Sequence, residues 1–135
     1  IYQFEAMYSF YKPAGTTSHT LSTAFAGSAT LNNIGYNFFE ADGNATIPYG
    51  LTNTSHIGFT NSTSGLVATN ALTAATQVVV ILLRGSVSVN VGGTFIPQYV
   101  LSAAPGGVYT TQPGSYFAIY PVGISGNNNI IGSWI

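Results

Sequence analysis

The feature that most constrains the fold is a run of β-branched and aliphatic residues in the second half of the chain, from Gln77 to Val91. It is continuously apolar from Val78 to Leu83 and then alternates polar with apolar residues. β-branched side chains pack well on a pleated surface, and a period of two places successive side chains on opposite faces of a strand. The run therefore predicts a long strand at the centre of a sheet, covered on both faces along its apolar half.

The same period of two recurs in earlier segments, such as Tyr2 to Phe10 and His19 to Phe25, and no segment shows apolar residues at helical spacing. Turn-forming pairs separate the alternating segments, most clearly Asp42-Gly43, Gly92-Gly93 and Pro113-Gly114. Eight to ten short strands at such spacing are typical of an all-β, antiparallel two-sheet sandwich, and we expect a jelly-roll-like one.

We expect the Gly92-Gly93 turn to be a hairpin, with a strand returning over Thr94–Ser102. Pro97 lies within that return and has no N–H to donate, which predicts an edge position or a bulge. A length of 135 residues favours one domain over 1–135. Because the chain opens at Ile1 within an alternating pattern, we expect this domain to be a fragment or C-terminal module of a longer protein.

Charged residues make up only 4% of the chain, against a usual quarter. Two basic residues cannot neutralise enough phosphates for nucleic-acid binding, and the longest apolar run, six residues, is too short for a membrane span. So few titratable groups also argue against an enzyme, and we expect neither catalytic residues nor a cofactor. The five charged residues are Glu5, Lys12, Glu40, Asp42 and Arg84.

The remaining candidates for chemistry are two histidines and one close pair of acids. No Asp, Glu or Cys flanks His19 or His56 at a metal-ligand spacing, so we expect surface or hydrogen-bonded histidines and no metal site. Glu40 and Asp42 lie two residues apart beside a turn signal. A glycosidase needs two carboxylates on either side of a cleft, so solvated acids in a turn are the favoured interpretation.

Arg84 directly follows the apolar run. A buried guanidinium needs partners, because an isolated buried charge is very costly. Two alternatives stay open: Arg84 is a structural residue that binds loop carbonyls or Glu40, or it forms a bond between subunits near a symmetry axis.

The segment Asn44–Gly65 is rich in Asn, Thr and Ser and predicts a long loop broken by a short strand at His56 to Thr60. Long loops in compact domains are often functional, and loops on a rigid scaffold frequently carry recognition. Tyr49, Asn53 and His56 are therefore candidate receptor-binding residues at an exposed edge. The alternative is a connecting loop without a partner.

Three Asn-x-Ser/Thr triplets fall in the same segment, beginning at Asn44, Asn53 and Asn61. Each is a candidate for N-glycosylation in a host that has the machinery. A chain this rich in Asn, Ser and Thr also produces such triplets by chance.

From Leu83 to Gly107 the chain reads LRG-x-V-x-V-N-x-GGT-x-x-PQ followed by SAAPGG, and GSYF follows at Gly114–Phe117. Together with Ala14–His19 and Phe25–Leu31, this pattern resembles a module near the C-termini of tailed-bacteriophage virion proteins, both fibre-like and capsid-decorating. The resemblance implies a trimeric or repeated β-rich particle component and transfers no catalytic residue. The strand plan is similar to the C1q and tumour-necrosis-factor jelly rolls at the level of fold alone.

Two functional hypotheses follow. The first is a non-enzymatic virion module, a phage fibre tip or capsid decoration, whose partners are other virion proteins and a glycan or protein of the host surface. The alternative is a glycosylated filament subunit that is secreted or held at the cell surface. A net charge of −1 leaves little repulsion between copies, so we expect a homo-oligomer, with a trimer favoured.

Overall fold

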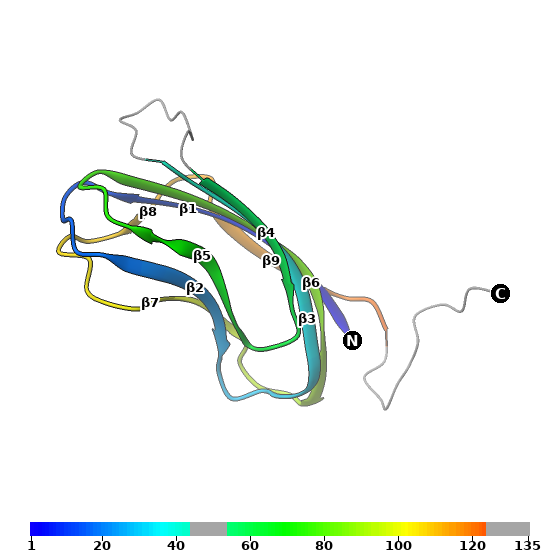
Figure 1. The fold of residues 1–135 in the computed structure, drawn as a ribbon. Helices are drawn as coiled ribbons and strands as arrows, with labels where there is room; N and C mark the ends of the chain where they lie inside the picture. The colour runs from blue at the N-terminus through cyan, green and yellow to red at the C-terminus, as the bar shows by residue number, and fades with distance from the viewer. Residues whose placement is uncertain (44–53, 124–135) are drawn as a thin grey trace.

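The computed structural model describes residues 1–43 and 54–123, and within these ranges nine strands form two antiparallel sheets and no helix occurs (Figure 1). Sheet A has the order β4-β3-β6-β1-β8, with β9 also paired to β1, and sheet B has the order β5-β2-β7. The predicted all-β, two-sheet architecture is confirmed. The strands are β1 (Tyr2–Lys12), β2 (His19–Ala26), β3 (Thr30–Gly43), β4 (Thr54–Thr60), β5 (Ser64–Leu72), β6 (Gln77–Val91), β7 (Ile96–Leu101), β8 (Thr110–Thr111) and β9 (Tyr116–Pro121).

The long strand β6 lies at the centre of sheet A, paired with β1 along one edge and with β3 along the other. This confirms its predicted central position. The expectation that its apolar half is covered on both faces is only partly right: Val79 and Ile81 are fully buried, but Leu82 is 43% exposed. Even-numbered side chains of β6 point to the outer face of sheet A, which none of the described residues covers from Leu82 to Ser86.

The core lies between the two sheets and is dominated by aromatic rings. Phe25 of β2 stacks on Phe95 with centroids 4.7 Å apart and meets Phe4 of β1 edge-on at 5.1 Å. The Tyr36 ring packs against Phe4 and Phe25, and its hydroxyl shares a 3.1 Å hydrogen bond with the Thr23 hydroxyl. The alternating residues predicted for β1 and β2 therefore supply the core, as expected from their period.

The Gly92-Gly93 turn is not a hairpin, contrary to the prediction. The following strand, β7, pairs with β2 in sheet B, so this turn carries the chain from one sheet to the other. The physical reason is that β1 and β3 already occupy both edges of β6. Pro97 does lie on an edge strand of sheet B, which confirms that part of the prediction.

The turn signal at Asp42-Gly43 does precede a change of direction, since β4 pairs antiparallel with β3, but these two residues still belong to β3. Asp42 and Gly43 pair with Val79 and Val78 of β6. The register of β3 against β6 shifts between Thr30 and Asn33. The pairing of Gly35 with Ser86 continues into a regular ladder.

Gly85 is the glycine that the central register requires. A Cβ at this position would come within 2.3 Å of the Gly35 carbonyl oxygen and 2.4 Å of the Tyr36 Cβ. We expect Gly85→Ala to lower the free energy of unfolding by about 1–3 kcal/mol, because overpacking here displaces backbone. Gly92→Ala is the matched control, since a Cβ there meets no atom within 4 Å. Thermal unfolding of both variants measures the difference, and equal melting temperatures would contradict it.

Candidate functional site

Strand register builds three parallel rows of side chains on the outer face of sheet A. Each row crosses the sheet at right angles to the strands, because directly paired residues point to the same face. The first row is polar, the second carries charges, and the third is apolar. In that order they are Tyr120, Gln3, Ser86 and Gly35; then Ala118, Glu5, Arg84, Asn37 and Phe59; then Tyr116, Met7, Leu82, Phe39 and Ile57.

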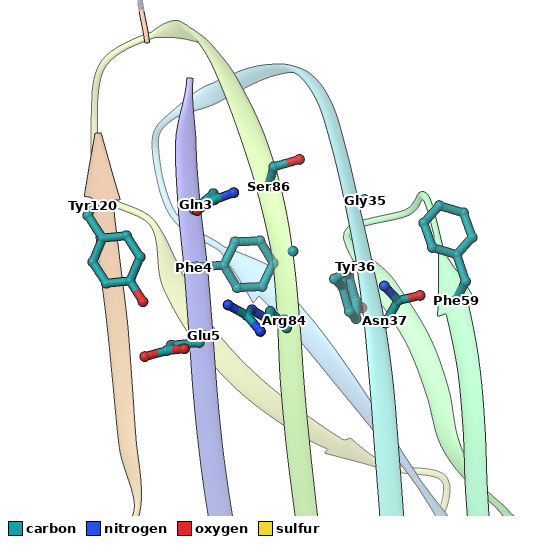
Figure 2. Close-up of a pocket in the computed structure, with 11 residues that line it drawn as sticks. Gln3, Phe4, Glu5, Gly35, Tyr36, Asn37, Phe59, Arg84, Ser86 and Tyr120 are labelled. Carbon is teal, nitrogen blue, oxygen red and sulfur yellow. The ribbon is translucent and has the colours of Figure 1, made fainter. Parts of the chain in front are cut away.

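The first two rows enclose a groove of about 310 Å³, which we call the polar groove (Figure 2). Gly35 forms part of its floor, and the Phe59 ring lies 3.5 Å from the position that a Gly35 Cβ would take. Tyr120 on β9 borders one end and Phe59 on β4 the other. The polar groove is defined by Gln3, Glu5, Gly35, Asn37, Phe59, Arg84, Ser86 and Tyr120.

The polar groove contains two of the five charged residues of the chain, Glu5 and Arg84, directly paired across β1 and β6. The hydroxyl of Tyr120 points toward the Glu5 carboxylate (Figure 2). Desolvation, then interaction with Glu5, raises the pKa of Tyr120, and the nearby Arg84 charge partly opposes this. The groove therefore presents a cation, an anion, amides, hydroxyls and two aromatic rings on one open face.

The premise that Arg84 is buried is wrong. Its position in the alternation of β6 places it on the outer face, where it is exposed and forms no hydrogen bond or ion pair with another described residue. The side chain of Glu40, which was predicted as a partner of Arg84, points to the inner face of sheet A, whereas Arg84 points to the outer face. The alternative of a bond between subunits stays a prediction.

The third row, which we call the apolar row, lies beside the polar groove. Ile57 on the edge strand β4 is 81% exposed, and Phe39 and Leu82 are also exposed. Together with Tyr116 they border a second hollow of about 330 Å³ that also reaches Glu5 and Arg84. The outer face of sheet A thus changes from polar to apolar within the width of one row.

Glu40 and Asp42 are not solvated, which corrects the prediction. Both are even-numbered residues of β3 and point into the core, where Glu40 is 0% exposed and Asp42 is also buried. The Glu40 Oε2 lies 2.9 Å from Nδ1 of His56, which stands directly opposite on β4. Desolvation raises the pKa of Glu40 to about 7, and the Asp42 charge adds to this while His56 opposes it.

His19 and Lys12 are also buried, and each is held by hydrogen bonds. Because the Thr17 carbonyl can only accept, Nδ1 of His19 donates to it at 2.8 Å, and Nε2 accepts from the Tyr109 hydroxyl at 2.9 Å. Lys12 donates to the carbonyls of Gly15 and Ala74. Desolvation lowers the pKa of Lys12. These contacts indicate a structural role, and hydrogen-bonded histidines were expected.

Of the three predicted receptor-binding residues, the structure describes only His56. Tyr49 and Asn53 lie outside the described residues, as does the glycosylation candidate Asn44. His56 is on the edge strand β4, but its ring turns toward Glu40 and its side chain is only 21% exposed. Asn61 is exposed between β4 and β5.

Sequence reasoning missed the polar groove because its residues come from five strands. The available signal was the alternation of side chains between the two faces of a strand. Gln3 and Glu5 are polar positions of the first alternating segment and therefore face away from the core. Alternation within one strand does not show which residues of the other strands lie beside them.

The chain matches no family model, no curated protein and no solved structure. Within residues 1–43 and 54–123, no group of three or more His, Cys, Asp or Glu side chains is placed to hold a metal ion. In the same ranges there is no helix long and apolar enough to cross a membrane.

The buried Glu40 predicts an unusual pH dependence. Its pKa of about 7 in the folded state lies above the ordinary value of 4.5 expected in the unfolded chain, so folding binds a proton between these values. The stability that Glu40 contributes is therefore complete below about pH 4.5 and is lost as pH rises through about 7. We expect the melting temperature to fall by about 2–6 °C between about pH 5 and pH 8, relative to Glu40→Gln.

The comparison with Glu40→Gln isolates the titration of Glu40, because the variant keeps the size of the side chain and stays neutral at every pH of the scan. Scanning calorimetry at matched ionic strength provides both melting profiles. Parallel profiles for the two proteins would contradict a buried, proton-binding Glu40.

Proposed function

We propose that this chain is a non-enzymatic structural module of a bacteriophage particle that binds a saccharide of the host surface through the polar groove. The observation that carries the proposal is the groove itself, an open hollow on a sheet face bordered by Tyr120 and Phe59. Amide, hydroxyl and charged side chains lie between these rings. Such a mixture of stacking surfaces and hydrogen-bonding groups suits a ligand with polar edges and apolar faces.

A saccharide is such a ligand. Its ring hydroxyls can donate to Glu5 and to the amide oxygens of Gln3 and Asn37, and its hydroxyl oxygens can accept from Arg84. The C–H faces of its rings can stack on Tyr120 or Phe59. Because these groups stand on paired strands, little ordering of the backbone is needed when a ligand binds.

The assignment to a phage particle rests on the resemblance of Leu83–Gly107 and Gly114–Phe117 to virion modules. The scarcity of charge and the absence of cysteine in the sequence agree with a rigid β-rich particle component. A fibre tip and a capsid decoration both remain within this proposal. The alternative, a glycosylated filament subunit, draws on the exposure of Asn61, and intact mass spectrometry separates the two because glycans add discrete mass.

Two substitutions in the polar groove test saccharide binding. A Cβ at Gly35 would meet the Phe59 ring at an ordinary 3.5 Å, so Gly35→Ala should fold normally while raising the groove floor. Tyr120→Ala removes a stacking surface that is already exposed. We expect both variants to weaken binding to host cells and to arrayed saccharides several-fold, with melting temperatures close to that of the wild type.

Val108→Ala is the control for this experiment, since Val108 is 74% exposed between β7 and β8 and lies outside both the polar groove and the edge strand β7. It should leave binding unchanged. Binding that survives both groove substitutions would remove the polar groove as the site.

We also propose that copies of the chain associate, with a trimer favoured, through the edge strand β7. Ile96, Tyr99 and Val100 of this strand are exposed, and β7 carries no charged residue of the kind that usually protects an edge. Because Pro97 interrupts the N–H donors along β7, side-chain packing rather than a continuous ladder would join the copies.

Val100→Lys places a charge on this surface at a position that is 48% exposed, so the fold should tolerate it. We expect light scattering to show an oligomer for the wild type and a smaller species for the variant. A wild type that stays monomeric at high concentration would overturn the association.

A further inference from the structure

We propose that the polar groove selects a saccharide that carries a carboxylate group, and that Arg84 binds this carboxylate. This inference rests on the proposed function, since it names the class of saccharide that the same groove takes. It goes further because it assigns a charge to the ligand and a specificity-determining role to one residue.

The N–H donors of Arg84 are open to a ligand. Arg84 lines the groove, is exposed, and has no hydrogen bond or ion pair with any other residue in the described ranges. The other side-chain cation, Lys12, is buried and donates to backbone carbonyls, and the amine of Ile1 donates to Gly123 at 2.9 Å. Arg84 therefore offers a guanidinium whose planar set of N–H donors is free for a ligand.

The shape of the Arg84 guanidinium favours an anionic group as the hydrogen-bond acceptor on the ligand. A guanidinium presents two parallel N–H groups, which match the two oxygens of a carboxylate or of a phosphate. A neutral saccharide offers hydroxyl oxygens, which are uncharged and accept weaker hydrogen bonds from a guanidinium than carboxylate oxygens do. An anionic group on the saccharide is therefore the better partner for Arg84.

A carboxylate suits the surroundings of Arg84 better than a phosphate does. Glu5 is directly paired with Arg84 across β1 and β6, which places their Cβ atoms roughly 5 Å apart. A phosphate monoester carries a charge of about −1.5 to −2 and would be repelled strongly by Glu5. A carboxylate carries a single charge, and hydroxyls on the same sugar ring can donate to Glu5.

The polar groove is long enough for more than one sugar ring. Tyr120 on β9 and Phe59 on β4 are separated by four strand-to-strand steps, or roughly 19 Å at about 4.8 Å each. Glu5 and Arg84 stand between these rings (Figure 2). An acidic sugar ring at the centre would therefore leave room for linked rings to reach the aromatic side chains on either side.

The test is a saccharide array in which every carboxylated member has its methyl ester beside it, together with neutral and phosphorylated saccharides. The probes are the purified wild type, Arg84→Gln and Arg84→Lys, each checked by thermal unfolding. We expect the wild type to bind carboxylated saccharides about ten- to a hundred-fold more tightly than their esters, the range for a hydrogen bond to a charged group.

Arg84→Gln should abolish the preference over the ester and retain weak binding to both. Arg84→Lys should keep part of the preference for the carboxylated saccharide, because it retains the positive charge but loses the two parallel N–H donors of the guanidinium. The preference of the wild type should also shrink with added salt, since the groove is open to solvent.

The outcomes separate the two proposals. Binding of carboxylated saccharides and their esters with equal affinity would overturn this inference and leave the proposed function intact. Stronger binding of phosphorylated members would overturn the choice of carboxylate. Binding to no saccharide at all, with folded protein, would overturn both. An Arg84→Gln variant that keeps the preference would overturn the role of Arg84.

Discussion

The structure depends on one constraint, which is that β6 is hydrogen-bonded along both edges over most of its length. Each pairing determines which residues stand opposite each other, so one register sets the core and the outer face together. On the inner side, Gly85 lies between Phe4 and Tyr36, and on the outer side Arg84 lies between Glu5 and Asn37. A slip of one residue would exchange the two faces, and the close fit of Gly85 beside Tyr36 opposes such a slip.

Much of the fold could be predicted because strand formation is a local property. Alternation indicated β1 and β2, the β-branched run indicated the central β6, and Pro97 indicated an edge. Strand pairing could not be predicted in the same way. A Gly-Gly pair reports that the chain changes direction, and it does not report whether the next strand joins the same sheet or the other one.

The candidate site was harder to predict for two physical reasons. The turn signal at Asp42-Gly43 conflicts with the alternation that carries Glu40 and Asp42 into the core, where burial raises the pKa of Glu40 and its contact with His56 opposes that rise. The apolar run before Arg84 suggested that this residue is buried, although the alternation of β6 places it on the outer face of sheet A. The groove itself joins residues as distant as Gln3 and Tyr120, and only the register brings them together.

The alternation that builds the polar groove also separates recognition from stability. Glu5 stands between the buried Phe4 and Ala6, and Arg84 stands between the buried Leu83 and the tightly packed Gly85. Substitutions at the outward positions therefore leave the inward ones untouched. Under the proposed function, a change of a few exposed side chains on paired strands would alter which host surface is bound, while the buried residues that hold the sheets together stay the same.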